Sequence, residues 1–316
     1  MKFLWQNLKK PFFVLAPMEG ATDIVFRQII ASCARPDVFF TEFTNVQGLL
    51  SKGNKQVAQR LKFDKAEKPI IAQIWGNKPE YFYKAAVEVA KMGFDGIDIN
   101  MGCPERNIVK KGSCSALIKT PQLAKEIIEA TREAAGDLPV SVKTRIGFSE
   151  FESSWIEFLL NQNLPALTLH LRTVKEMSLV PAHWEKAVEI SALRNKLSPN
   201  TILIGNGDVK DVVDAKIKAS VSGFDGIMIG RGVFHNPYAF DESIDFHMLS
   251  PNTKIDLLKK HLNLFEKTWK DEKTFPPLKR YFKIYINGFD GASDLREKLM
   301  ATTNINQART ILSNYK

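Results

Sequence analysis

The chain has 316 residues, of which 44% are hydrophobic, and this size suits one barrel of roughly 250 residues with an appended segment, or two ordinary domains. Its formal net charge of +9 favours a polyanionic partner. Three cysteines without CxxC or Cys/His spacing exclude a disulfide framework and a metal motif, and no apolar run reaches the roughly 18 residues of a membrane span. Residues 1–10 also lack the apolar core of a signal peptide, so we expect a soluble, cytoplasmic protein.

Short apolar runs alternate with amphipathic stretches from residue 12 onward, and each run ends in a polar or glycine residue. The runs cover residues 12–16, 37–41, 69–72, 95–99, 139–142, 166–169, 201–204 and 225–229. Amphipathic stretches such as residues 81–92, 121–135 and 209–219 predict helices between them. Near-continuous apolar strands are typical of a covered parallel sheet, and eight such units predict a closed (β/α)8 TIM barrel.

The active site of such a barrel lies at the C-terminal ends of its strands. Lys143 and His170 directly follow apolar runs, although each alone also fits a solvated lysine or a hydrogen-bonded rim histidine. The sequences GNGD at residues 205–208 and GRG at residues 230–232 follow the last two runs. Their backbone N–H groups and one guanidinium favour a phosphate, carried by a substrate or by a cofactor with one phosphate. The dinucleotide fingerprint and the P-loop pattern are both missing after the first run.

The fourth run ends in Asn-Met-Gly-Cys-Pro at residues 100–104. Gly102 permits a turn and Pro104 fixes φ, so the loop between them holds Cys103 stiffly. An unperturbed thiol has a pKa of about 8.5 and can therefore donate a proton at neutral pH. A lone cysteine is more often a buried structural residue, but the flanking residues favour a general acid here.

The barrel pattern ends near Phe240, and a break at residues 250–252 precedes a segment that we expect to be helical. The expected helices cover residues 254–269, 278–286, 292–300 and 306–313. Residues 243–316 hold 13 Lys and Arg against 8 Asp and Glu, a net of +5 out of +9 for the whole chain. Aromatic residues interleave with these basic groups, and we expect most of the aromatics to form a small helical core. The outward-facing Lys and Arg would contact nucleic-acid phosphates. We predict two domains, residues 1–242 and 243–316.

These motifs together resemble the tRNA-dihydrouridine synthases, flavoproteins that reduce uridines in transfer RNA. The resemblance runs nearly end to end, and its most specific elements are Asn-x-Gly-Cys-Pro at residues 100–104 and His-x-Arg-Thr at residues 170–173. The other matching elements are APMEGATD at 16–23, TE at 41–42, AQ at 72–73, KTRIG at 143–147, both glycine loops and NGFDGA at 287–292. Cys114 and Leu171 depart from it, because the family commonly has glycine at these positions. If position 114 needs a positive φ, Cys114 is strained or its loop takes another path.

The resemblance implies an FMN-binding barrel followed by a small all-helical tRNA-binding domain. FMN, reduced by NADPH or NADH, would pass a hydride from N5 to C6 of the uracil while Cys103 protonates C5. The implied cofactor-binding residues are Pro17, Met18, Gln73, Lys143, His170, Asn206, Gly207, Asp208, Gly230 and Arg231. The implied substrate-binding residues are Asn100, Arg145, Arg172, Lys279 and Arg280. We expect a monomer that uses neither a metal nor a membrane.

Within this set, Lys143 would stabilise the anionic reduced flavin, and Gln73 and Met18 would hold its ring system. Two alternatives stay open. An FMN barrel oxidoreductase acting on a free pyrimidine or another small conjugated molecule would share the flavin residues but would not need the basic helical segment. A non-catalytic RNA-binding protein on a barrel fold is disfavoured by the intact Cys103, Lys143 and His170.

Overall fold

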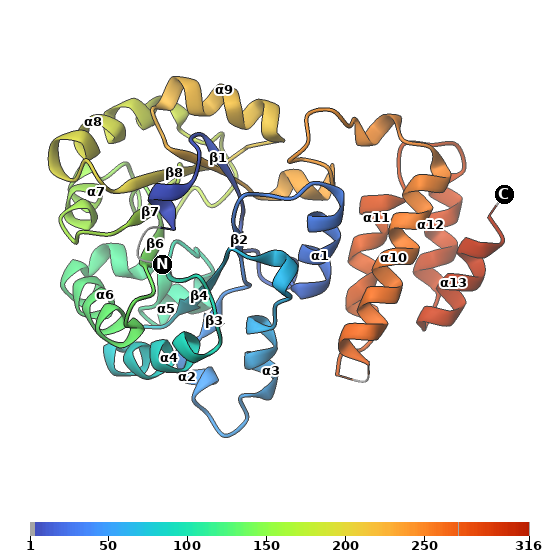
Figure 1. Ribbon diagram of the computed structural model, residues 1–316, viewed down its shortest axis with the longest axis horizontal. Coiled ribbons are helices and arrows are strands. Elements are labelled where there is room, and N and C mark those ends of the chain that lie inside the picture. The colour runs from blue at the N-terminus through green and yellow to red at the C-terminus, as the bar shows by residue number, and fades with distance from the viewer. Residues whose placement is uncertain (1–3, 271, 316) are drawn as a thin grey trace.

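Parallel strands form one sheet that closes into a barrel in the computed structural model, which describes residues 4–270 and 272–315 (Figure 1). The strands are β1 (Phe12–Leu15), β2 (Phe39–Phe40), β3 (Thr44–Asn45), β4 (Ile70–Trp75), β5 (Gly96–Met101), β6 (Val140–Arg145), β7 (Ala166–His170), β8 (Ile202–Asn206) and β9 (Gly226–Ile229). Their order is β1-β9-β8-β7-β6-β5-β4-β2, with the short β3 also pairing with β4. The ring closes where the Leu15 N–H donates to the Val38 carbonyl at 3.1 Å. The prediction of a (β/α)8 barrel is confirmed.

Several strands end later in the chain than predicted, and the added residues include ones that line the site. Strands β4 to β8 continue one to three residues beyond the predicted ends, so Gln73, Asn100 and Lys143 lie within strands rather than after them. The predicted ends coincide with the last apolar residue of each run, whereas strand residues at the open mouth of a barrel face a polar cavity. Strand β2 is shorter than predicted, and β3 was not predicted. Because Gln73, Asn100 and Lys143 lie inside their strands, the hydrogen bonds between neighbouring strands fix their backbone.

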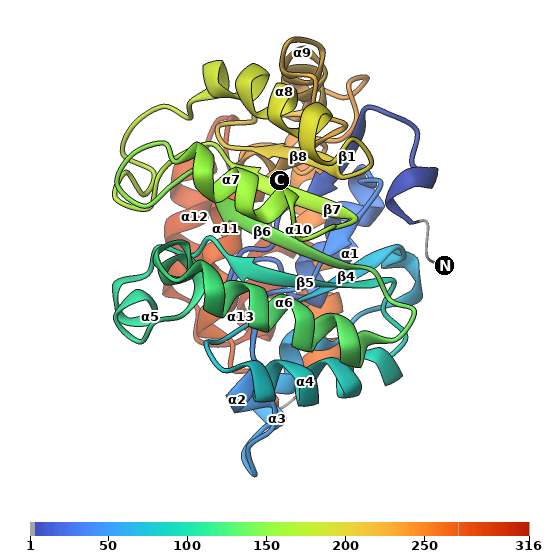
Figure 2. The ribbon, with the colours of Figure 1, turned by 90° about the vertical axis from the view of Figure 1, so that its left-hand side faces the viewer.

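Helices follow the strands around the barrel, as Figure 2 shows for α4, α6, α7 and α8 on its outer surface. The barrel helices are α1 (Ile24–Cys33), α2 (Val46–Leu49), α3 (Lys55–Ala58), α4 (Pro79–Lys91), α5 (Arg106–Lys110), α6 (Pro121–Ala135), α7 (Ser153–Leu160), α8 (Ala187–Leu197) and α9 (Val212–Ser222). Short 3-10 helices are η1 (Trp5–Asn7), η2 (Gln59–Leu61), η3 (Lys65–Glu67), η4 (Cys114–Lys119), η5 (Trp184–Lys186), η6 (Arg231–Phe234), η7 (Phe246–Met248) and η8 (Pro276–Tyr281). Asp23 caps the start of helix α1, because its carboxylate accepts the N–H groups of Val25 and Phe26 at 3.1 Å each.

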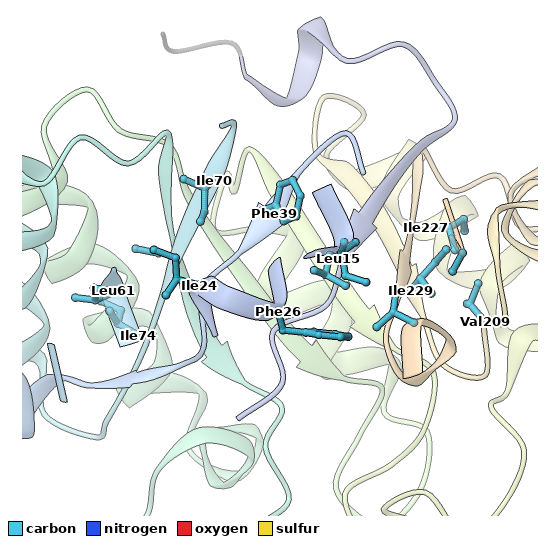
Figure 3. Packing of buried hydrophobic residues seen from close by; sticks show 14 of the residues in the cluster. Leu15, Ile24, Phe26, Phe39, Leu61, Ile70, Ile74, Val209, Ile227 and Ile229 are labelled. Atoms are coloured by element: carbon cyan, nitrogen blue, oxygen red, sulfur yellow. The ribbon is translucent and has the colours of Figure 1, made fainter. Parts of the chain in front are cut away.

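Alternating strand residues build two hydrophobic clusters, one on each side of the barrel wall. Leu15, Phe39 and Ile70 belong to the larger cluster, which packs against the helices (Figure 3). Their neighbours Val14, Phe40 and Ile71 belong to the smaller cluster, which fills the barrel interior. The same interior cluster includes Trp5, whose ring centroid lies 6.2 Å from that of Phe12 at the start of β1. The N-terminal end of the barrel is therefore plugged, and the opposite end remains for a site.

The C-terminal helices lie beside α1, on one side of the barrel (Figure 1). They are α10 (Pro251–Trp269), α11 (Phe282–Tyr285), α12 (Ala292–Ala301) and α13 (Ile305–Ser313). The helix predicted over residues 278–286 is divided between the 3-10 helix η8 and the single turn of α11. Within the described residues, none of the helices is long and apolar enough to span a membrane.

The helical segment contacts the barrel through both apolar and polar groups. The ring of Tyr281 lies 5.1 Å from that of Phe26, and its hydroxyl donates to the Ala21 carbonyl at 2.7 Å. Lys273 forms an ion pair with Asp23 at 3.0 Å. A domain boundary between residues 242 and 243 stays a prediction, and residues 1–3, 271 and 316 of the two predicted domains lie outside the described residues.

Candidate active site

A cavity of about 290 Å³ opens among the C-terminal ends of the barrel strands. The predicted residues that line it are Pro17, Met18, Gln73, Asn100, Cys103, Lys143, Arg145, His170, Arg172, Asn206, Gly207, Asp208, Gly230 and Arg231. The lining residues that were not predicted are Ala16, Phe43, Gly102, Pro104, Ser178 and Val209. Residues from all eight barrel strand ends and the loops after them therefore meet at one place, as expected for this fold.

A network of amide and carboxyl groups forms the wall contributed by β4, β5 and β6. Gln73 Nε2 donates to Asp98 Oδ2 at 2.7 Å, and Gln73 Oε1 accepts from Asn100 Nδ2 at 3.0 Å. Ser141 donates to the other oxygen of Asp98 at 2.6 Å. Burial raises the pKa of Asp98 to about 6. These bonds fix which way the Gln73 and Asn100 amides face, and Asp98 is a positioning residue that sequence reasoning missed.

Asn100 also shapes the loop that carries Cys103. Its Oδ1 accepts the N–H groups of Gly102 and Cys103, each at 3.0 Å, which closes an Asx turn. A Cβ on Gly102 would lie 3.3 Å from the backbone of Thr144, so glycine lets the loop approach β6 more closely than a larger residue ordinarily would. The half-buried Cys103 therefore has a fixed position at the edge of the cavity.

Cys103 lies next to a second thiol. All three cysteines are free, and the Cys114 thiol forms a hydrogen bond with the Cys103 thiol. This bond is the main reason why the pKa of Cys103 falls to about 7, while burial raises the pKa of Cys114 well above its ordinary value. Cys114 has a φ of +54°, so the strained alternative expected for this departure from glycine is confirmed.

Lys143 provides a cation at the centre of the site. Its ammonium donates to Asn206 Oδ1 at 3.2 Å, and Asn206 Nδ2 in turn donates to the Met228 carbonyl at 2.9 Å. Desolvation lowers the pKa of Lys143 to about 8. In the part of the chain that the structure describes, Lys143 forms no ion pair with a carboxylate. The cavity is thus suited to a ligand that carries or develops negative charge near this ammonium.

His170, Arg172, Asp208 and Arg231 form a second cluster beside the glycine loops. Arg172 Nη1 donates to His170 Nε2 at 3.1 Å, and because a guanidinium only donates, the histidine is neutral with its proton on Nδ1. Burial and the surrounding cations hold the pKa of His170 well below its ordinary value. Asp208 accepts from Arg172 and, at 3.2 Å, from Arg231. Asp208 therefore holds both guanidinium groups at this end of the cavity.

Gly207 lies where a side chain has no room. Its φ is +126°, and a Cβ would lie 2.7 Å from the Cβ of Ala182 and 3.2 Å from Cδ2 of His170. Leu171, the second departure from the family pattern, is fully buried in the core and does not line the cavity.

Arg145 fixes two loops at the mouth of the cavity. Its Nε donates to the Gly102 carbonyl at 2.9 Å, and its Nη1 donates to the carbonyls of Thr173 and Met177, each at 2.8 Å. Arg172 similarly donates to the Val180 carbonyl at 2.6 Å. Sequence reasoning predicted both arginines but missed the loop at residues 173–182, because one of the residues that anchor it, Arg145, lies on another strand.

Lys279 and Arg280 lie outside this cavity. Lys279 Nζ donates to the Met300 carbonyl at 2.7 Å, and Arg280 donates to the carbonyls of Gly20 and Pro277. Their predicted contact with substrate stays a prediction. Among the described residues, the structure holds no group of three or more His, Cys, Asp and Glu that could hold a metal ion.

The family model for dihydrouridine synthase matches residues 14–315. The chain belongs to this family. A probable tRNA-dihydrouridine synthase of Staphylococcus aureus (strain COL) is 49% identical over 99% of this chain and 95% of its own length. Probable tRNA-dihydrouridine synthase 2 of Bacillus subtilis (strain 168) is 46% identical over 99% of this chain and 96% of its own length. Family membership thus covers the barrel and the helical segment together.

Solved structures share the barrel at much lower identity. Morphinone reductase in complex with tetrahydroNAD is 13% identical, with a TM-score of 0.52 over 74% of this chain and 86% of that chain. A complex of 2-naphthoyl-CoA reductase is 12% identical, with a TM-score of 0.54 over 76% of this chain and 52% of that chain. This likeness is one of fold alone.

Proposed function

We propose that the chain reduces specific uridines in tRNA to 5,6-dihydrouridine, with FMN as cofactor and NADPH or NADH as reductant. The observation that carries the proposal is the thiol of Cys103, fixed by an Asx turn at the edge of the cavity in a chain that belongs to the dihydrouridine synthase family. Its relatives in S. aureus and B. subtilis are named probable tRNA-dihydrouridine synthases. The proposal also implies a cytoplasmic enzyme, and we propose that it acts as a monomer.

The cavity fits FMN on chemical grounds. At its centre lies an ammonium that forms no ion pair with a carboxylate of the described residues, and two guanidinium groups beside a glycine loop lie at one end. When bound and reduced, FMN supplies the hydride for the reaction. Lys143 would contact the part of the ring system that becomes negative, and Gln73, Met18 and Pro17 would hold it in place. The set around the phosphate would comprise His170, Asn206, Gly207, Asp208, Gly230 and Arg231.

Cys103 would supply the proton to C5 of the uracil, because its thiol faces the same cavity and its pKa of about 7 leaves much of it protonated at neutral pH. Asn100, Arg145 and Arg172 would bound the pocket for the base and its nucleotide. The helical segment, with Lys279 and Arg280, would contact the phosphates of tRNA. Phosphate contacts would position the RNA without reading its sequence.

The test uses the purified protein with tRNA isolated from a strain that lacks this gene, and mass spectrometry of nucleosides measures dihydrouridine. We expect dihydrouridine to form in tRNA with the wild type. Cys103→Ala should lose roughly 10²-fold or more in rate, as for a missing general acid, while oxidation of NADPH by the flavin continues. Cys33→Ala is the matched control, because Cys33 lies outside the cavity lining.

Free uridine and uracil form the second arm of this experiment. Reduction of these small molecules in preference to tRNA would favour the FMN oxidoreductase acting on a free pyrimidine. A folded protein that binds tRNA but releases no flavin on acid treatment, and makes no dihydrouridine after reconstitution with FMN, would refute the enzymatic proposal.

A further inference from the structure

Two chain segments bring Cys103 and Cys114 together. Cys103 follows β5, and Cys114 begins η4, which lies against β5. The N–H and the hydroxyl of Ser115 both donate to the Cys103 carbonyl, at 3.4 and 2.7 Å. The two thiols then form a hydrogen bond with each other. The hydrogen bonds of Ser115 therefore hold together the two segments that carry these thiols.

The two thiols differ in what can reach them. Cys103 lines the cavity, whereas the side chain of Cys114 is 0% exposed. A small oxidant that enters the cavity therefore meets Cys103 first. A thiol whose pKa lies near the ambient pH is partly thiolate, which is the form that peroxides oxidise. Cys114 is placed to react with an oxidised Cys103, and it is shielded from reacting with anything larger.

We propose that Cys103 and Cys114 form a reversible disulfide when the protein meets a peroxide, and that this disulfide switches off the general acid while protecting it from irreversible oxidation. The formation of the disulfide is independent of the proposed function. Only its effect on activity rests on the proposed role of Cys103 in uridine reduction.

The chemistry balances with hydrogen peroxide as the oxidant. The Cys103 thiolate attacks one peroxide oxygen, the O–O bond breaks, and the departing hydroxide takes a proton to become water, which leaves Cys103 as a sulfenic acid. The Cys114 sulfur then attacks the Cys103 sulfur, the S–O bond breaks, and the hydroxide leaves with the proton of Cys114 as a second water. Two thiols have lost two electrons in total, and one peroxide has been reduced to two waters. A dithiol reductant reverses the step.

The positions of Arg and Lys in the sequence allow the disulfide between Cys103 and Cys114 to be detected in a digest. Cleavage after Arg and Lys places Cys103 in the peptide 92–106 and Cys114 in the peptide 112–119, while Cys33 lies in a third peptide. The whole protein is treated with a small excess of hydrogen peroxide, its remaining thiols are blocked with N-ethylmaleimide in denaturant, and the digest is analysed by mass spectrometry. We expect peptides 92–106 and 112–119 to be linked in the wild type and in the control Cys33→Ala. Treatment with dithiothreitol should separate them and restore at least half of the uridine reduction.

Cys114→Ala supplies the decisive comparison. Without the second thiol, Cys103 should proceed to the sulfinic and sulfonic acids, and dithiothreitol should recover less than a tenth of the lost activity. Oxidation of wild-type Cys103 to those acids without a link to Cys114, or equal recovery of wild type and Cys114→Ala, would overturn the proposal. If the untreated protein makes no dihydrouridine although the linked peptide forms, the proposed function fails and the disulfide stands.

Discussion

At the scale of single residues, proton donation by Cys103 depends on Cys114. The hydrogen bond from Cys114 is the largest influence on the Cys103 pKa, which it lowers to about 7. A general acid works in its protonated form, so proton donation should be complete well below pH 7 and lost as the pH rises through the pKa. We expect the rate at which tRNA oxidises the pre-reduced protein to fall above about pH 7. Stopped-flow measurement of the flavin absorbance at a series of pH values tests this expected fall in rate.

Cys114→Ala should move this decline to higher pH, because the variant lacks the hydrogen bond that stabilises the Cys103 thiolate. Cys33→Ala should leave the pH profile in place. If Cys114→Ala and the wild type decline at the same pH, another group with a nearby pKa sets the profile. Lys143, whose pKa is about 8, would then be the group to test.

Lys143 should contribute to cofactor affinity through its charge. We expect Lys143→Met to weaken FMN binding about 10- to 100-fold, since a hydrogen bond to a charged group contributes about 1.5–3 kcal/mol. Fluorescence titration of the apoprotein with FMN measures the dissociation constant. Lys210→Met is the matched control, because Lys210 is exposed and does not line the cavity. Equal affinities of Lys143→Met and the wild type would place the flavin away from this ammonium.

At the scale of elements, the loop after β5 depends on its close approach to β6. In Gly102→Ala the new methyl group would lie 3.3 Å from the Thr144 backbone, which cannot move without disturbing β6. The loop and Cys103 should instead shift by a few tenths of an ångström, and the rate should fall by less than the roughly 10²-fold that a misplacement of about 1 Å can cost. Gly53→Ala provides the control, since its added Cβ meets no atom within 4 Å.

Dihydrouridine formation and thermal unfolding should be measured together for Gly102→Ala and Gly53→Ala. The expected result is a loss of rate in Gly102→Ala with a midpoint of unfolding close to that of the wild type. Wild-type activity in Gly102→Ala would mean that the loop adapts, and that its stiffness does not position the thiol.

The barrel strands and the loops after them show which features could be predicted from the sequence and which could not. The apolar runs predicted all eight barrel strands, because strands buried on both faces need continuous apolar residues. The motif at residues 100–104 identified Cys103 because glycine and proline restrict the backbone locally. Asp98 was missed, since an acid inside an apolar run gives no sign of facing Gln73 and Ser141. The partners of Arg145 were also missed, because Thr173 and Met177 lie about 30 residues further along the chain.

At the scale of the whole molecule, two basic residues of the helical segment that were predicted to contact tRNA also form hydrogen bonds within the protein. Arg280 reaches back to the Gly20 carbonyl, and Tyr281 to that of Ala21, both 260 residues away in sequence. Lys279 instead binds the last turn of α12 through the Met300 carbonyl. The two predicted phosphate contacts therefore already hold the fold together. Lys260 and Lys283 are exposed, as Arg280 is.

Salt dependence of tRNA binding separates a phosphate contact from a structural role. Each contacting charge releases counterions on binding, which adds roughly −0.7 to −0.9 to the slope of log affinity against log salt. We expect Lys279→Ala and Arg280→Ala each to reduce the steepness by about one unit and to weaken binding to all tRNAs alike, because a phosphate contact reads no sequence. Lys283→Ala should do the same if the surface extends along α11. Lys91→Ala, on α4 of the barrel, is the control.

Thermal unfolding of the same variants completes the test, because Arg280→Ala also removes a hydrogen bond between the barrel and the helical segment. Such a bond contributes about 0.5–1.5 kcal/mol, so a modest fall in the unfolding midpoint is expected whether or not RNA is bound. A lowered midpoint with an unchanged salt slope would assign Arg280 to the interface between the two parts of the chain alone. A reduced slope in Arg280→Ala at a temperature where the variant is fully folded would place its guanidinium against the RNA. If all the basic variants kept the wild-type slope, tRNA would have to approach by another face of the molecule.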